Sequence, residues 1–144
     1  MANRRALLLG AAGLLPLGEL LAQAARSGFD TRGLAPTLKA LGLATPQPSR
    51  ELLLDAPDIA ENGAAVRIEL SCKLPGLKRL WLLAEKNPLS LLAAFELSDA
   101  MEPRLATQIK LAESGLVYGV AQLADGKLLM TQKDVKVTLG GCAA

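Results

Sequence analysis

The chain has 144 residues, 51% of them hydrophobic, and a formal net charge of +2 from 16 basic and 14 acidic residues. This length and apolar content predict one domain with a sizeable core. The charges form no long runs and only 3% of residues are aromatic, which argues against nucleic-acid binding. Histidine is absent, so the commonest general base and metal ligand are missing, and we expect neither self-contained catalysis nor a metal site.

Residues 1–24 have the pattern of an export signal. Arg4 and Arg5 precede an apolar stretch at 6–17, and small residues at 22–24 offer a cleavage site. Paired arginines indicate the twin-arginine route, with an ordinary secretory signal as the alternative. Glycines and a proline interrupt the segment well short of the roughly 20 apolar residues that span a bilayer. We therefore expect a periplasmic protein with no membrane association after the signal is cleaved.

Residues 25–50 are predicted to contain a short helix and a proline-rich loop. Within 31–43, four leucines recur at roughly helical spacing, with Thr31 as the N-cap and Gly42 near the stop. Two prolines at 44–49 then interrupt any regular element. This N-terminal part is therefore expected to precede the main body of the domain.

Residues 51–139 show short apolar runs separated by turn residues at intervals near ten, which is typical of strands. The predicted strands are 51–56, 64–73, 77–85, 91–97, 105–113, 116–123 and 127–139. About seven strands of this kind favour an all-β fold, an immunoglobulin-like antiparallel β-sandwich. We expect the stretch 105–123 to form its central hairpin. Gly119 and Ala121 in that hairpin would allow close backbone approach or leave a shallow surface for a partner.

Alternation along two of these strands predicts which side chains face the core. In the first, the inward set is Val66, Ile68, Leu70 and Cys72. Cys72 is therefore expected to be a small core side chain, with a bond to Cys142 or to another molecule as the alternative in an oxidising compartment. In the last strand the inward set is Val135, Val137 and Leu139.

Residues 140–144 have the pattern of a flexible carrier arm. Their sequence is Gly140, Gly141, Cys142, Ala143 and Ala144. Two glycines lack a Cβ and can act as a swivel, so a thiol beyond them is expected to leave the protein surface. At roughly 3.3 Å per extended residue, this tail would carry the sulfur on the order of 10 Å from the last strand.

Several short motifs together resemble one family. They are the twin-arginine leader, Ala-Glu-Asn-Gly at 60–63, Glu-Lys-Asn-Pro at 85–88, Asp-Gly-Lys at 125–127 and a valine-rich last strand that runs into Gly-Gly-Cys at 140–142. With these motifs the chain resembles the SoxY family, the Y subunit of the bacterial sulfur-oxidising multienzyme system, over essentially its whole length. The family pattern has glycines on both sides of the cysteine, whereas Ala143 follows it here.

The resemblance implies an immunoglobulin-like sandwich that forms a heterodimer with SoxZ, a second small β-sandwich. It also implies that Cys142 covalently carries thiosulfate-derived sulfur, with no cofactor and no catalytic residue in this chain. The implied enzyme partners are a haem-containing thiosulfate-conjugating enzyme, a sulfate-releasing hydrolase and a sulfane dehydrogenase. Lys133 and Lys136 either assist anionic cargo or are simply exposed.

Two alternatives to a covalent carrier remain open at the level of sequence. One is a non-covalent β-sandwich scaffold or a divergent carrier homologue with an inactive arm, since alanine beside Cys142 restricts the backbone more than glycine does. The other is a soft-metal chaperone with Met101, Met130 and Cys72 as ligands, but these residues show no convergent spacing.

Overall fold

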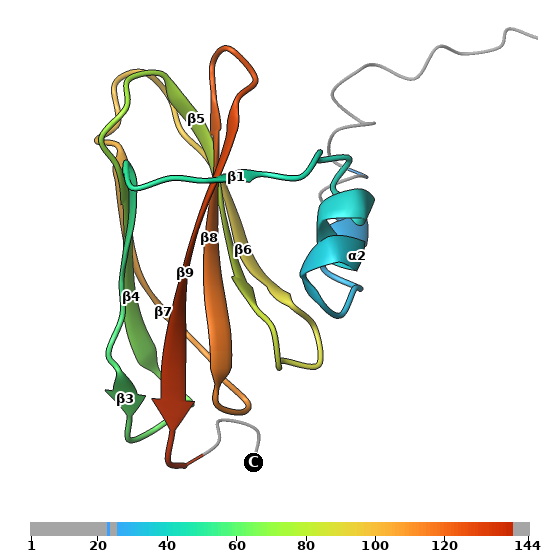
Figure 1. Ribbon diagram of the computed structural model, residues 1–144, viewed down its shortest axis with the longest axis vertical. Helices are drawn as coiled ribbons and strands as arrows, with labels where there is room; N and C mark the ends of the chain where they lie inside the picture. The colour runs from blue at the N-terminus through green and yellow to red at the C-terminus, as the bar shows by residue number, and fades with distance from the viewer. Residues whose placement is uncertain (1–22, 24–25, 140–144) are drawn as a thin grey trace, which may run out of the picture.

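The computed structural model describes residue 23 and residues 26–139 of the chain (Figure 1). The predicted arm at 140–144, including Cys142, lies outside the described residues, and so does the predicted leader apart from residue 23. The described residues therefore bear on the body of the domain and on the strand that leads to the arm.

The described residues form nine strands and the helix α2 (Leu34–Ala40), with a further helical segment at 26–28. The strands are β1 (Gln47–Pro48), β2 (Leu52–Asp55), β3 (Ile59–Ala60), β4 (Val66–Cys72), β5 (Leu77–Ala84), β6 (Leu91–Glu96), β7 (Arg104–Ile109), β8 (Gly115–Leu123) and β9 (Leu128–Val137). The all-β prediction is confirmed, and all seven predicted strands are present within a few residues of their expected bounds. The two-residue strands β1 and β3 were not predicted.

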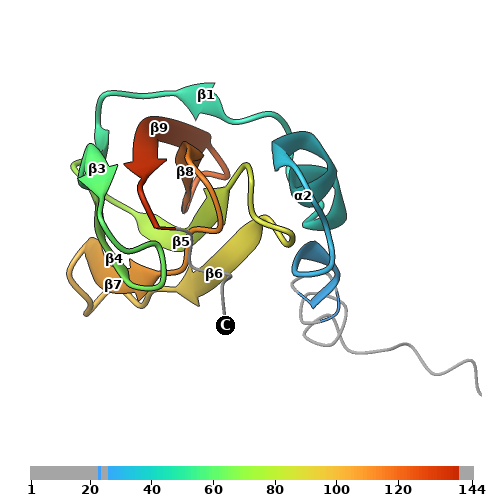
Figure 2. The same ribbon diagram turned by 90° about the horizontal axis from the view of Figure 1, so that it is seen from below.

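The strands form two sheets that pack face to face (Figures 1 and 2). The larger sheet has the order β1-β9-β8-β5-β6, and β3 also pairs with β9; the smaller sheet has the order β2-β4-β7. The long strands pair antiparallel, whereas β1 and β3 run parallel to β9. These two short strands cover the two ends of the outer edge of β9, at 129–130 and 136–137.

The predicted hairpin at 105–123 is wrong, because its two halves lie in different sheets. β7 pairs with β4 in the smaller sheet, whereas β8 pairs with β5 and β9 in the larger one. The connection at 110–114 therefore crosses from one sheet to the other. Alternation marks the buried face of each strand, but it does not identify the neighbouring strand.

The main core lies between the sheets and confirms the inward face predicted for β4. Its Cys72 is a free thiol that is only 4% exposed. Gly119 on β8 gives the close approach that the sequence indicates, because an added Cβ there would overlap Leu70 Cδ1 on β4. The alternative expectation, a shallow surface for a partner at Gly119 and Ala121, is wrong, because Ala121 is fully buried.

Helix α2 covers part of the outer face of the larger sheet (Figure 1). Its Leu38 joins a second buried cluster that includes Trp81 and Tyr118. Thr31 is not the N-cap. Gly33 holds that position with a φ of 89°, a value that favours glycine, and Thr31 Oγ1 instead lies 2.7 Å from Gly28 O. None of the helices among the described residues is long and apolar enough to cross a membrane.

Candidate functional site at the end of strand β9

The end of β9 is held by the strand and turn that run beside it. We call residues Val137, Thr138 and Leu139 the arm root, because they directly precede Gly140. Thr138 N donates to Ala60 O at 3.1 Å, and Leu139 O accepts from Gly63 N at 2.8 Å. The main chain is therefore fixed up to the residue before the first glycine of the predicted arm.

Side-chain hydroxyls hold the arm root as well. Ser114 Oγ accepts from Val137 N at 2.8 Å, and Thr138 Oγ1 donates to Glu61 O at 3.0 Å. The serine comes from the β7–β8 connection and the glutamate carbonyl from the loop after β3. Because each net hydrogen bond stabilises by about 0.5–1.5 kcal/mol, these contacts together oppose fraying of the last strand.

A buried asparagine extends this network to the β5–β6 loop. Asn87 is only 6% exposed; its Nδ2 donates to Lys110 O at 2.7 Å, and its Oδ1 accepts from Ala112 N at 2.9 Å. Leu111 N, between these two residues, donates to Gly63 O at 2.7 Å. The motifs at 60–63 and 85–88 thus meet at the end of the sandwich where the arm root lies.

We expect Asn87→Ala to lower the free energy of unfolding by about 1–3 kcal/mol, because it strips a donor and an acceptor from two backbone groups at a buried position. Chemical denaturation followed by circular dichroism measures this loss. Asn62→Ala is the matched control, since Asn62 is exposed and its Oδ1 accepts from Ala64 N at 2.9 Å. Equal unfolding midpoints for Asn87→Ala and wild type would contradict the role given to Asn87.

The two lysines of β9 have different surroundings. Lys133, with a side chain 30% exposed, donates to Ala56 O and forms an ion pair with Asp58 at 3.1 Å. It holds the segment that leads into β3, so Lys133 is not simply an exposed lysine. Lys136 is exposed. One lysine thus has a structural role, and the other is the accessible cation nearer to the arm root.

Leu139 does not face the core as expected from alternation. Its side chain is 61% exposed. Sheet alternation stops with β9 at Val137, so the inward prediction holds for Val135 and in part for Val137, which packs against the core at its edge. The arm root therefore presents an apolar side chain to solvent immediately before Gly140.

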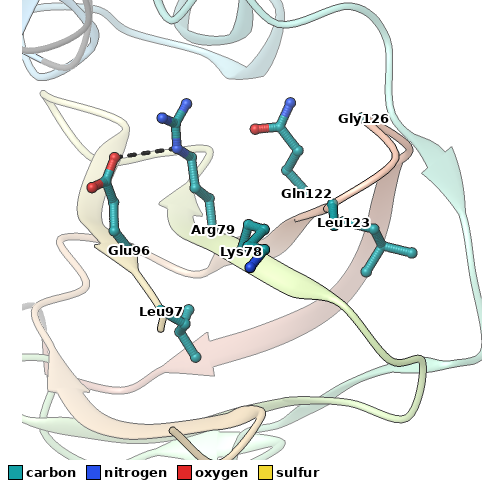
Figure 3. A pocket seen from close by; sticks show the side chains of 8 residues that line it. Lys78, Arg79, Glu96, Leu97, Gln122, Leu123 and Gly126 are labelled. Atoms are coloured by element: carbon teal, nitrogen blue, oxygen red, sulfur yellow. Dashed lines mark ion pairs between the residues drawn. The ribbon is translucent and has the colours of Figure 1, made fainter. Parts of the chain in front are cut away.

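A pocket at the opposite end of the sandwich is a poor candidate for an active site (Figure 3). Both cations that line it are paired: Arg79 lies 3.2 Å from Glu96, and Lys78 lies 2.6 Å from Asp99. The turn at 125–127, another of the family motifs, is also at this end (Figure 1). Among the described residues, no three His, Cys, Asp or Glu side chains are grouped so that they could hold a metal ion.

Burial raises the pKa of Tyr118 above its ordinary value, and the charge of nearby Glu85 raises it further. The phenol therefore stays neutral at physiological pH. It lies beneath helix α2 and has a packing role. The sequence predicted an arm at 140–144 but did not identify Ser114, Asn87 and Gly63 as the residues that hold its root; the turn motifs at 60–63 and 85–88 were local signals for two of them.

The model of the family "Sulfur oxidation protein SoxY" matches residues 38–142, a range that includes the arm root and Cys142. The chain belongs to the SoxY family. A solved structure, the sulfur carrier protein SoxY from Chlorobium limicola f thiosulfatophilum, is 28% identical, with a TM-score of 0.63 over 72% of this chain and 94% of that chain. SoxY membership supports a sulfur carrier role, suggests a carrier rather than an enzyme, and implies partnership with SoxZ.

More distant structures share the fold alone. The superoxide reductase (neelaredoxin) of Ignicoccus hospitalis is 18% identical, with a TM-score of 0.51 over 61% of this chain and 80% of that chain. A putative superoxide reductase of Thermotoga maritima is 14% identical, with a TM-score of 0.52 over 65% of this chain and 87% of that chain. No curated protein sequence gives a significant match.

Proposed function

We propose that this SoxY-family protein carries thiosulfate-derived sulfur covalently on Cys142 and presents it to separate enzymes. The family match runs through Cys142, and the main chain is hydrogen-bonded up to Leu139. Between them stand Gly140 and Gly141. A fixed root followed by two residues without a Cβ suits a thiol that must reach several active sites in turn. The family match through Cys142 carries the proposal.

The loading step is an oxidation. The Cys142 thiol and thiosulfate join through a new S–S bond, and they lose one proton and two electrons, which pass to a haem-containing partner. Hydrolysis by a second partner then places the oxygen of water on the terminal sulfonate sulfur and releases sulfate, so a persulfide remains on Cys142. A sulfane dehydrogenase then takes six electrons from that remaining sulfur, which gains three oxygens from water and becomes a sulfonate on Cys142. A further hydrolysis releases this group as sulfate and restores the thiol.

Activation of the thiol is assigned to the partner enzymes. An unperturbed cysteine has a pKa near 8.5, so only a few per cent is thiolate at neutral pH. The whole chain has no histidine that could act as a base beside the sulfur. The electron acceptor and the proton acceptor must both lie in the loading enzyme, which leaves this protein the part of carrier.

We also propose a periplasmic location, supported by Arg4 and Arg5 before the apolar stretch at 6–17. The twin-arginine route moves folded proteins. Such a route suits a protein that leaves the cytoplasm already assembled with a SoxZ-type subunit. The heterodimer is thus part of the same proposal.

The deciding experiment is mass spectrometry of the protein after incubation with thiosulfate and the haem-containing partner. We expect a mass increase of one thiosulfate group on the tryptic peptide 137–144, which contains Cys142. A reductant should remove the added mass, because the bond is an S–S bond. An unmodified peptide under conditions that load an established SoxY would favour the non-covalent scaffold instead.

Alkylation of the folded protein should separate the two thiols. Cys72 is 4% exposed, so iodoacetamide should label it only after unfolding. Cys142 should be labelled within minutes in native buffer. Peptide mapping with and without guanidinium measures both rates, and rapid native labelling of Cys72 would overturn the assignment of Cys72 as a core residue.

A further inference from the structure

The edge of the larger sheet at β6 has no partner strand among the described residues. β6 pairs with β5 on one side only, at the end of the strand order. Figure 2 shows β6 at the margin of the sandwich, on the side away from β9. The opposite edge differs, because β1 and β3 cover β9 there. The fold thus protects one edge of this sheet and leaves the other free.

The backbone groups on the free side of β6 can be assigned from one hydrogen bond. Leu97 N, just after β6, donates to Lys78 O at 2.8 Å. Because inward and outward N–H groups alternate in an antiparallel pair, Phe95 and Ala93 also turn theirs toward β5. The N–H and C=O groups of Ala94 and Glu96 therefore point away from the sheet and are available to another strand.

The side chains of β6 at 91–95 lack the features that normally protect an edge, and a charge enters only at the last residue of the strand, Glu96. Residues 91–95 are Leu-Leu-Ala-Ala-Phe, without charge or proline, and those at 92–95 are partly exposed. Natural edge strands are blunted by lysine, proline, short length or bulges. The register of β6 against β5 shifts between Leu82 and Leu83, near the start of β6, which leaves the stretch 93–96 regular. The uncharged part of this edge, at 91–95, is suited to strand pairing.

The edges of the smaller sheet are better protected. β2 has only four residues, ends in Asp55, and follows Arg50 and Glu51. β7 begins with Arg104, whose guanidinium lies 3.2 Å from Glu69 on β4. Charges on these strands would oppose the approach of an apolar strand. The β6 edge is therefore the better docking edge of the two sheets.

We propose that the β6 edge receives a strand of the SoxZ-type partner and so extends the larger sheet across the heterodimer. The inference rests on the heterodimer of the proposed function. Main-chain hydrogen bonds supply affinity in such strand addition, and the exposed parts of Leu92 and Phe95, which also pack against the core, supply apolar contact. β6 runs along the side of the sandwich, whereas the arm root lies at its end, so a subunit docked here leaves the arm root open to the enzymes (Figures 1 and 2).

Ala94→Pro tests the proposal, because it removes a backbone N–H that points away from the sheet without removing a hydrogen bond to β5. Ala106→Pro is the matched control. Cys72 N donates to Pro103 O at 2.9 Å, so the same alternation turns the N–H of Ala106 outward on β7. Both alanines lie within six-residue edge strands. We expect Ala94→Pro to weaken binding of purified SoxZ-type subunit at least about tenfold, and Ala106→Pro to leave it within about twofold of wild type.

Isothermal titration calorimetry measures these affinities, and circular dichroism checks that each variant is folded. A second pair of variants, Ala94→Lys and Ala106→Lys, keeps the test valid if a proline variant fails to fold. Lysine keeps the backbone N–H, but its charge on an edge strand opposes pairing with another strand. Wild-type affinity in both position-94 variants would overturn the proposal, as would a β6 edge occupied by a second copy of this chain. The binding assay contains no thiosulfate, so a failure of the β6 proposal can be told apart from a failure of Cys142 to carry sulfur.

Discussion

Cys142→Ser is expected to abolish covalent sulfur loading completely. A serine oxygen cannot form the S–S bond to thiosulfate, and the other thiol of the chain, Cys72, lies buried between the sheets. Intact mass after incubation with thiosulfate and the haem-containing partner measures loading directly. The variant should keep the unfolding midpoint of wild type, because the residues that hold the arm root end at Leu139.

Cys72→Ala is the matched control for this loss. It removes the buried thiol at a cost of about 1 kcal/mol in the free energy of unfolding, the order expected for a small cavity, and leaves Cys142 in place. Loading should therefore be retained in full. The assignment of the carrier thiol would be wrong if Cys142→Ser still gained the mass of thiosulfate, or if Cys72→Ala lost that gain.

The second large effect concerns the packing of the two sheets at Gly119. An added Cβ there would overlap Leu70 Cδ1 and lie 3.2 Å from Thr131 Cγ2. Leu70 is fully buried and cannot swing away. We expect Gly119→Ala to lower the free energy of unfolding by about 1–3 kcal/mol through overpacking, and Leu70→Ala to lower it by about 2–5 kcal/mol through the cavity it leaves.

The double variant separates this contact from a general effect of substitution. Once Leu70 is alanine, the new methyl at position 119 no longer meets a δ-carbon and partly fills the cavity. The double variant should therefore lose at least about 1 kcal/mol less than the sum of the two single variants. Urea denaturation of all four proteins gives this coupling energy, and strict additivity would show that Leu70 is not the side chain that excludes a Cβ at Gly119.

The end of the sandwich combines a rigid base with a predicted pliable arm. Backbone bonds from Ala60 and Gly63, with the hydroxyl of Ser114, fix the main chain as far as Leu139. An arm attached to a fraying strand would search a larger volume and meet an enzyme channel less often. Fixing the root reduces that volume, so the two glycines alone set the reach of the thiol.

Local chemistry was sufficient to predict the long strands and the burial of Cys72, whereas the arm that carries Cys142 stays a prediction. Short apolar runs between turn residues predicted the seven main strands, and a period of two predicted the burial of Cys72 on β4. Gly42 was correctly placed at the end of the helix, because its φ of 69° favours glycine. Glycines before Cys142 predicted the arm, and the same residues carried the resemblance to SoxY that the family match confirms. These features depend on the residue itself and its nearest neighbours along the chain.

Strand pairing, by contrast, was decided by contacts between distant segments. Short apolar runs predicted strands at 105–113 and 116–123, but the separation of β7 and β8 into two sheets depends on their pairing with β4 and β5. The meeting of Asn87 with Lys110 at the arm root arises in the same way. So does the free edge of β6, since a strand becomes an edge only by its place in the sheet order. Periodicity encodes burial, whereas neighbours are selected by the packing of the whole domain.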